Sequence, residues 1–213
     1  MKTVTDVGSV KNTLLRTYFH PDCFKLATHK SFGSLRFKTQ VSIDNTPTDV
    51  VVNTLCYGRK YDRESLHRGD NGAVTEFINI VFWRGGKDPS SDLEDLDKHE
   101  LLGAVGVKVK YQMVHDNPEE DYHADIKEFE LYPDLFTHSG DAQVELSATM
   151  LGTIVAGARV KKDLLAFKEA AGRTPELEVS NSDISVMSRR LDEIQFDMLE
   201  KYIEITNRQP LKE

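Results

Sequence analysis

The segment Val105-Gly-Val-Lys-Val-Lys-Tyr-Gln-Met113 alternates apolar residues with small or polar ones along its whole length. Side chains of a β-strand point to opposite faces in turn, so this period of two predicts a strand with one covered face. Residues 35–43 alternate in the same way with a basic outer face, and 124–131 predict a return strand. Residues 77–83 are apolar except for one Asn, which predicts a central strand, and 144–150 predict one more. Together these stretches predict a mixed, mainly antiparallel sheet.

Helical patterns surround these strands, and the expected fold class is therefore α+β with short helices and a long C-terminal amphipathic helix. Residues 5–18 form the first helical pattern. Thr46-Pro47-Thr48-Asp49 resembles a helix start, with a capping threonine, a proline in the first turn and an acid, and predicts a helix to Tyr57. Further helices are expected over 91–103 and 156–172. The predicted organisation is an α+β core domain over 1–172, a hinge over 173–179, and a helix over 180–207 for docking or oligomerisation.

The last helix has a narrow apolar seam, because its apolar residues recur mostly three and four positions apart. The seam consists of Ile184, Met187, Leu191, Ile194, Met198 and Ile205. Ser180 and Asp183 fit a capping box at its start. Four more apolar residues widen the surface towards its end: Phe196, Leu199, Tyr202 and Ile203. Such a surface needs a cover. The sequence leaves open whether its own domain or another chain supplies it, and the seam is our predicted contact for a homo-oligomer or an assembly partner.

Composition bounds the class of protein more than its function. The chain has 213 residues, a formal net charge of −8, and two cysteines, Cys23 and Cys56. We interpret these as reduced thiols, since the N-terminus has no apolar signal region, and expect a cytoplasmic protein without a transmembrane segment. The charge is uneven: residues 1–43 hold seven Lys and Arg against two Asp, whereas 88–145 hold sixteen acids. Basic and acidic regions of this kind can attract each other within a fold or between copies.

Basic residues in the N-terminal third of the chain predict a surface that binds nucleic acid. Its contacts would be Arg36, Lys38, Arg59, Lys60 and Arg63. Tyr57 and Tyr61 lie among these charges and could stack bases, as in single-strand binders. Against this, binding to phosphate needs a positive footprint, and the chain as a whole is acidic. The alternative is that the aromatic residues belong to the core and the charges to a solvated rim.

Catalytic and cofactor motifs are missing from the sequence, which has no nucleophile elbow and no glycine-rich phosphate loop. We therefore expect no enzymatic activity and no cofactor. The nearest approach to a metal site is His115, His123 and Asp125, which could meet at the mouth of a hairpin. Imidazoles and a carboxylate suit Zn²⁺ or Fe²⁺, but this spacing matches no recognised ligand pattern. A metal-dependent enzyme is accordingly the third hypothesis.

The order of a strand over 35–43, a short capped helix over 47–57 and later long strands resembles phage single-stranded-DNA-binding proteins and viral matrix proteins, at the level of pattern and without a diagnostic motif. This resemblance orders the hypotheses. The first is a non-enzymatic, self-assembling structural protein, such as a viral or phage component incorporated into a particle. The alternative is a nucleic-acid-binding accessory protein that uses the basic face described above.

Overall fold

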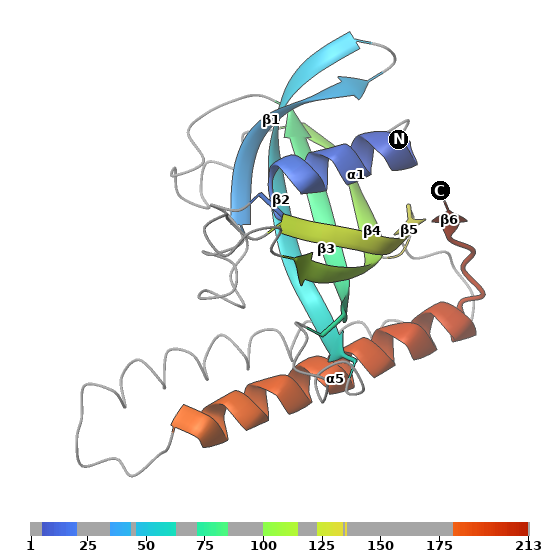
Figure 1. Cartoon of the computed structure of the whole chain (residues 1–213). Helices are drawn as coiled ribbons and strands as arrows, with labels where there is room; N and C mark the ends of the chain where they lie inside the picture. The colour runs from blue at the N-terminus through green and yellow to red at the C-terminus, as the bar shows by residue number, and fades with distance from the viewer. Residues whose placement is uncertain are drawn as a thin grey trace.

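In the part of the chain that the structure describes, the fold is an antiparallel sheet of six strands with one helix packed on each face (Figure 1). The computed structural model describes residues 6–20, 35–43, 46–62, 72–84, 100–114, 123–133, 135 and 181–212. The sheet order follows the chain, β1-β2-β3-β4-β5-β6. The elements are α1 (Val7–Arg16), β1 (Leu35–Ile43), β2 (Thr46–Tyr61), β3 (Val74–Arg84), β4 (Glu100–Val114), β5 (His123–Tyr132), α5 (Asn181–Ile205) and β6 (Leu211–Lys212). The mixed α+β class is thereby confirmed, with the sheet as its dominant part.

The larger core lies between the sheet and α1, which Figure 1 shows crossing one face of the strands. It collects the inward residues of every second position in the strands, for example Ile78 and Ile80 of β3. From α1 it receives Val10 and Leu14, both fully buried. The Asp6 side chain caps the helix by accepting a hydrogen bond from the Ser9 amide at 2.7 Å. The helix predicted over 5–18 and the strands predicted over 35–43, 77–83, 105–113 and 124–131 are confirmed within a few residues.

The helix predicted over 47–57 is wrong, because these residues form the long strand β2. Its threonine, proline and acid mimic a helix start, but Val50-Val51-Val52 follows directly, and β-branched residues favour strands. All three valines are buried. They point to alternating faces of the sheet, at positions where β2 lies between β1 and β3. Pro47 stands near the strand start, where the missing N–H does little harm. The predicted acidic helix over 91–103 is also wrong at its end, since β4 begins at Glu100.

Helix α5 covers part of the opposite face, where it lies mainly against β2, and it crosses the end of that strand in Figure 1. It ends in a Schellman motif. The Arg208 amide donates to the Ile203 carbonyl at 3.2 Å, and the Asn207 amide donates to the Glu204 carbonyl at 3.1 Å. Asn207 takes the required left-handed backbone at φ 48°.

Several predictions fall on residues outside the described ranges. These are the strand over 144–150, the helix over 156–172, the hinge over 173–179 and the cap at Ser180. The domain boundaries that depend on them stay predictions. Among the described helices, none is long and apolar enough to cross a membrane.

Candidate functional site

Helix α5 packs on the sheet through its aromatic residues. Phe196, Leu199 and Tyr202 are almost fully buried, and they form a second hydrophobic cluster with Phe77, Tyr132 and Leu135. The ring centroids of Phe77 and Phe196 are 4.9 Å apart. Since Phe77 and its neighbour Ile78 belong to different clusters, α5 and α1 cover opposite faces of β3. The residues that the sequence assigned to the widened surface are therefore those that hold α5 on its own sheet.

Helix α5 approaches the sheet most closely at Gly58. This residue lies at a register shift between Cys56 and Gly58, where β2 pairs with β3. A Cβ atom placed on Gly58 would lie 2.6 Å from the Phe196 backbone nitrogen and 2.8 Å from its Cα. The absence of a side chain thus allows the backbone of α5 to come into direct contact with the sheet.

Charged residues complete the docking. Lys60 Nζ lies 3.1 Å from Asp197 Oδ1, and Lys108 Nζ lies 2.7 Å from Glu200 Oε1. Both ammonium groups also lie over the Phe196 ring, at 5.5 and 5.7 Å from its centroid. The Lys60–Asp197 pair is more than half exposed on both sides and adds little stability. These contacts therefore chiefly fix the orientation of an acidic helix on a basic strip of the sheet.

The predicted seam of α5 is open in part. Met187 and Ile194 are each 55% exposed, and their neighbour Val186 is 61% exposed. Leu191, Met198 and Ile205 are half-buried, and the side chain of Ile184 is outside the described set. The N-terminal part of α5 extends past the end of β2 (Figure 1), whereas Ile194 directly precedes the residues that lie against Gly58. Met198 packs against the second hydrophobic cluster, so the open part of the seam is the part around Met187 and Ile194.

A buried charged cluster lies on the other face of the sheet, around Glu76 of β3. This carboxylate is fully buried. Its Oε2 accepts a hydrogen bond from the Tyr18 hydroxyl at 2.9 Å, and its Oε1 accepts one from the Tyr111 hydroxyl at 2.7 Å. Arg59 of β2 forms a short ion pair with the same Oε1 through Nε. Each carboxylate oxygen thus has a donor, as a buried charge requires.

The electrostatics of this cluster keep each group in one protonation state. Burial, and then the negative charge of Glu76, raise the pKa of Tyr18 and of Tyr111 well above the ordinary value of 10.0. Burial alone would lower the pKa of Arg59, but Glu76 and the nearby phenols more than offset it and raise that pKa well above its ordinary value. Both phenols therefore remain donors and Arg59 remains charged at neutral pH.

Glu76 is not among the predicted site residues, because the predicted strand begins one residue later, at Phe77. The signal was present: period-two alternation puts Glu76 on the same face as Ile78 and Ile80, which are buried. An acid at a core position of a strand implies a buried partner, and Arg59 is the residue directly opposite in the register.

The residues predicted to contact nucleic acid do not form one exposed strip within the described ranges. Arg59 is committed to Glu76, with only 12% of its side chain exposed. Lys60 is paired with Asp197, whereas Lys38 is exposed. The side chain of Arg36 and all of Arg63 are outside the described set. Nucleic-acid binding stays a prediction that rests mainly on Lys38.

The predicted metal ligands are likewise not gathered in what the structure describes. His123 is exposed at the start of β5, and Asp125 pairs with Lys127. His115 lies outside the described ranges. Among the residues placed there, no three His, Cys, Asp or Glu side chains come together as a metal site would require.

Comparison with protein-family models, with curated proteins and with solved structures finds no match to this chain. The resemblance to phage and viral proteins included a helix over 47–57, and that element is the strand β2. The function therefore has to be argued from the surfaces described above.

Proposed function

We propose that this chain is a non-enzymatic, self-assembling structural protein, and that the open seam of α5 binds a second copy. The observation that carries the proposal is the concentration of exposed apolar side chains on one stretch of helix. Val186, Met187 and Ile194 are three of the five large hydrophobic residues that are exposed in the described part of the chain. They lie on a helix whose docked face is already covered. Exposed apolar surface of this kind is typical of interaction sites.

The charges beside the seam favour a copy of the same chain as the partner. Arg190, Asp197 and Lys201 are all exposed and alternate in sign along α5. A surface that pairs with itself must contain both signs, because each patch meets an identical patch in a two-fold contact. Within the described ranges, Arg190 forms a surface pair with Glu193 at 3.6 Å, which contributes little within one chain. Arg190 can therefore exchange this partner for one across an interface.

Size-exclusion chromatography with light scattering tests the proposal with two matched variants. Ile194→Asp places a charge in the seam, and Leu15→Asp makes the same kind of change at an exposed position of α1. We expect the unaltered chain and Leu15→Asp to share one oligomeric mass, and Ile194→Asp to elute at the chain mass of 24.1 kDa. A monomeric unaltered chain at every concentration, or an Ile194→Asp variant with the unaltered mass, would contradict the proposal.

A further inference from the structure

A continuous series of side-chain contacts joins α1 to the open half of α5 through the sheet. It starts at Tyr18, just after α1, and passes to Glu76, which also binds Arg59. Arg59 Nη1 donates to the Tyr61 hydroxyl at 3.3 Å, and the Arg59 guanidinium carbon lies 6.0 Å from the centroid of the Tyr61 ring. We call Tyr18, Glu76, Arg59 and Tyr61, together with Arg189, the relay.

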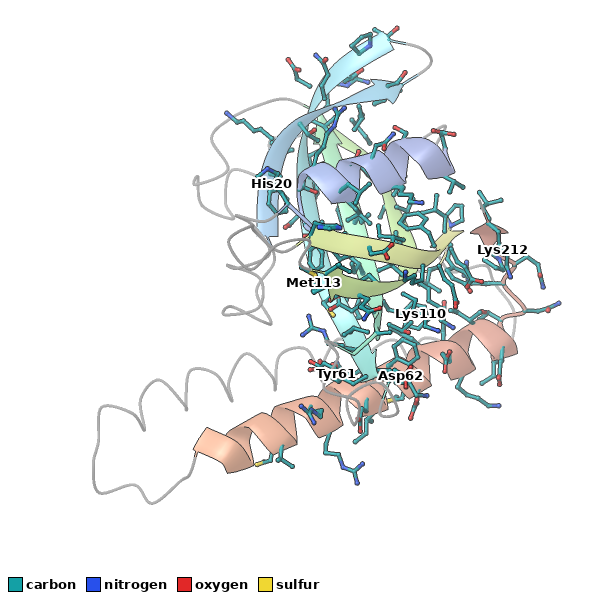
Figure 2. All side chains as sticks on the ribbon, in the orientation of Figure 1. His20, Tyr61, Asp62, Lys110, Met113 and Lys212 are labelled. Carbon is teal, nitrogen blue, oxygen red and sulfur yellow. The ribbon has the colours of Figure 1, made fainter. Side chains whose placement is uncertain are left out.

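The last contact of the relay reaches α5. The Arg189 guanidinium carbon lies 5.0 Å from the centroid of the same Tyr61 ring, a favourable cation–π distance. Figure 2 shows Tyr61 at the end of β2, next to α5. Arg189 lies between Met187 and Ile194 in the helix, so it holds the stretch that bears the proposed assembly surface. Among the residues that the structure describes, Arg190, the next residue, pairs with Glu193 at the surface.

The inner part of the relay has little freedom to rearrange, because a buried charge needs all its hydrogen bonds. If the Tyr18 hydroxyl leaves, Oε2 of Glu76 loses the donor that the structure gives it. The carboxylate must then rotate or admit water, and either change moves its partner Arg59. Arg59 in turn sets the position of the Tyr61 ring through two contacts, so a change at α1 alters the surface on which Arg189 rests.

We propose that α1 regulates the assembly surface of α5 through this relay. With α1 in place, the ring of Tyr61 is held for Arg189 and the open half of the helix is ordered for a second copy. When α1 is displaced, Arg189 loses this support and the stretch around Met187 opens more often. The inference rests on the proposed function for its biological meaning, but the coupling itself can be measured in the isolated chain.

Hydrogen exchange of the α5 backbone amides, followed by mass spectrometry on dilute full-length chain, tests the coupling with a double-mutant cycle. Tyr18→Phe removes one hydroxyl and keeps the ring, and Arg189→Ala removes the last contact. Each single variant should raise exchange over 186–191 about three- to fivefold, the change expected for losing one cation–π contact. The double variant should exchange no faster than Arg189→Ala alone. Arg190→Ala is the matched control, and its effect should add to that of Tyr18→Phe.

Additive effects of Tyr18→Phe and Arg189→Ala would overturn the inference, as would equal non-additivity with Arg190→Ala, because the coupling would then bypass Tyr61. If Tyr18→Phe does not fold, Tyr61→Phe replaces it in the cycle with the same expectation, since it removes only the hydroxyl that Arg59 binds. Light scattering separates the two proposals. If the chain associates but Tyr18→Phe and Arg189→Ala are additive, only the proposal of the relay is refuted. If the two changes are coupled but the chain stays monomeric, only the proposed assembly function is refuted.

Discussion

Replacing Gly58 by Ala tests the docking of α5, because this position allows the closest approach of helix and sheet. The added Cβ would meet three backbone atoms of the helix, at 2.6 and 2.8 Å in Phe196 and 3.0 Å in Gln195. Ordinary contacts begin near 3.4 Å, and backbone atoms cannot turn aside as the end of a side chain can. The helix as a whole must therefore retreat by about 0.8 Å.

The loss of stability follows from the packing contacts that this movement of the helix weakens. A gap of about 0.5–1 Å forfeits a quarter to a half of the dispersion attraction across it, and Phe196, Leu199 and Tyr202 all pack across this gap. Overpacking of this kind typically costs about 1–3 kcal/mol. Replacing Gly by Ala within a strand returns about 0.5–1 kcal/mol through backbone entropy. We expect the free energy of unfolding to fall by about 1–2 kcal/mol.

Urea unfolding followed by circular dichroism and by fluorescence of the single tryptophan, Trp83, measures this change. Gly8→Ala is the control, because its Cβ would lie 3.6 Å from the nearest atom, Oδ2 of Asp6, and Gly8 is in α1. The control should gain about 0.5–1 kcal/mol from the better helix propensity of Ala. If Gly58→Ala were as stable as the unaltered chain or more stable, the helix would not be seated on Gly58 and the reasoning would fail.

Two further predictions concern the buried charged cluster. Glu76→Gln leaves Arg59 as a buried charge without its partner and should cost about 3–5 kcal/mol in urea unfolding. Glu76→Leu combined with Arg59→Met should recover part of this loss, because the Tyr18 and Tyr111 hydroxyls still lose their acceptor. Equal stability of the single and double variants would contradict the prediction. Burial and the charge of Glu76 raise the pKa of Tyr18 and Tyr111 in the folded chain above the unfolded value of 10.0, so their contribution to stability is complete below pH 10.0 and is lost as the pH rises towards the folded pKa. Alkaline unfolding curves should therefore flatten in Tyr18→Phe combined with Tyr111→Phe, and an unchanged slope would refute the assignment.

The confirmed strands show which local patterns predict structure in this chain. The alternation of β4 and the continuous apolar run of β3 both agree with the final burial, because each of these strands lies between two others in the sheet. In β2 the local signals conflicted, since a capping pattern preceded a run of valines. The conflict is settled by pairing, since β2 pairs with β1 over 46–54 and with β3 over 50–61, and the three valines lie where both pairings overlap. That outcome depends on residues far away in sequence, which a local pattern does not contain.

The candidate site divides in the same way. The apolar seam of α5 could be read from spacing alone, as could the extra apolar residues near its end. Spacing alone could not show which of these residues would be covered: Phe196 is buried on the sheet, whereas Ile194 is exposed. A helix with apolar residues around much of its circumference can turn several faces inward, and the contact at Gly58 with the Lys60 and Lys108 pairs selects one.

The amino-acid sequence by itself determined the sheet-dominated α+β class, four of the strands, the first helix and the amphipathic character of the last one, because hydrophobic periodicity is a local property of the chain. Only the tertiary structure decided that 46–61 is a strand, that Glu76 and Arg59 meet in the core, and that Tyr61 links them to Arg189. These features arise from strand register and from the packing of segments distant in sequence. Their energies depend on burial and on partners that exist only after the chain has folded.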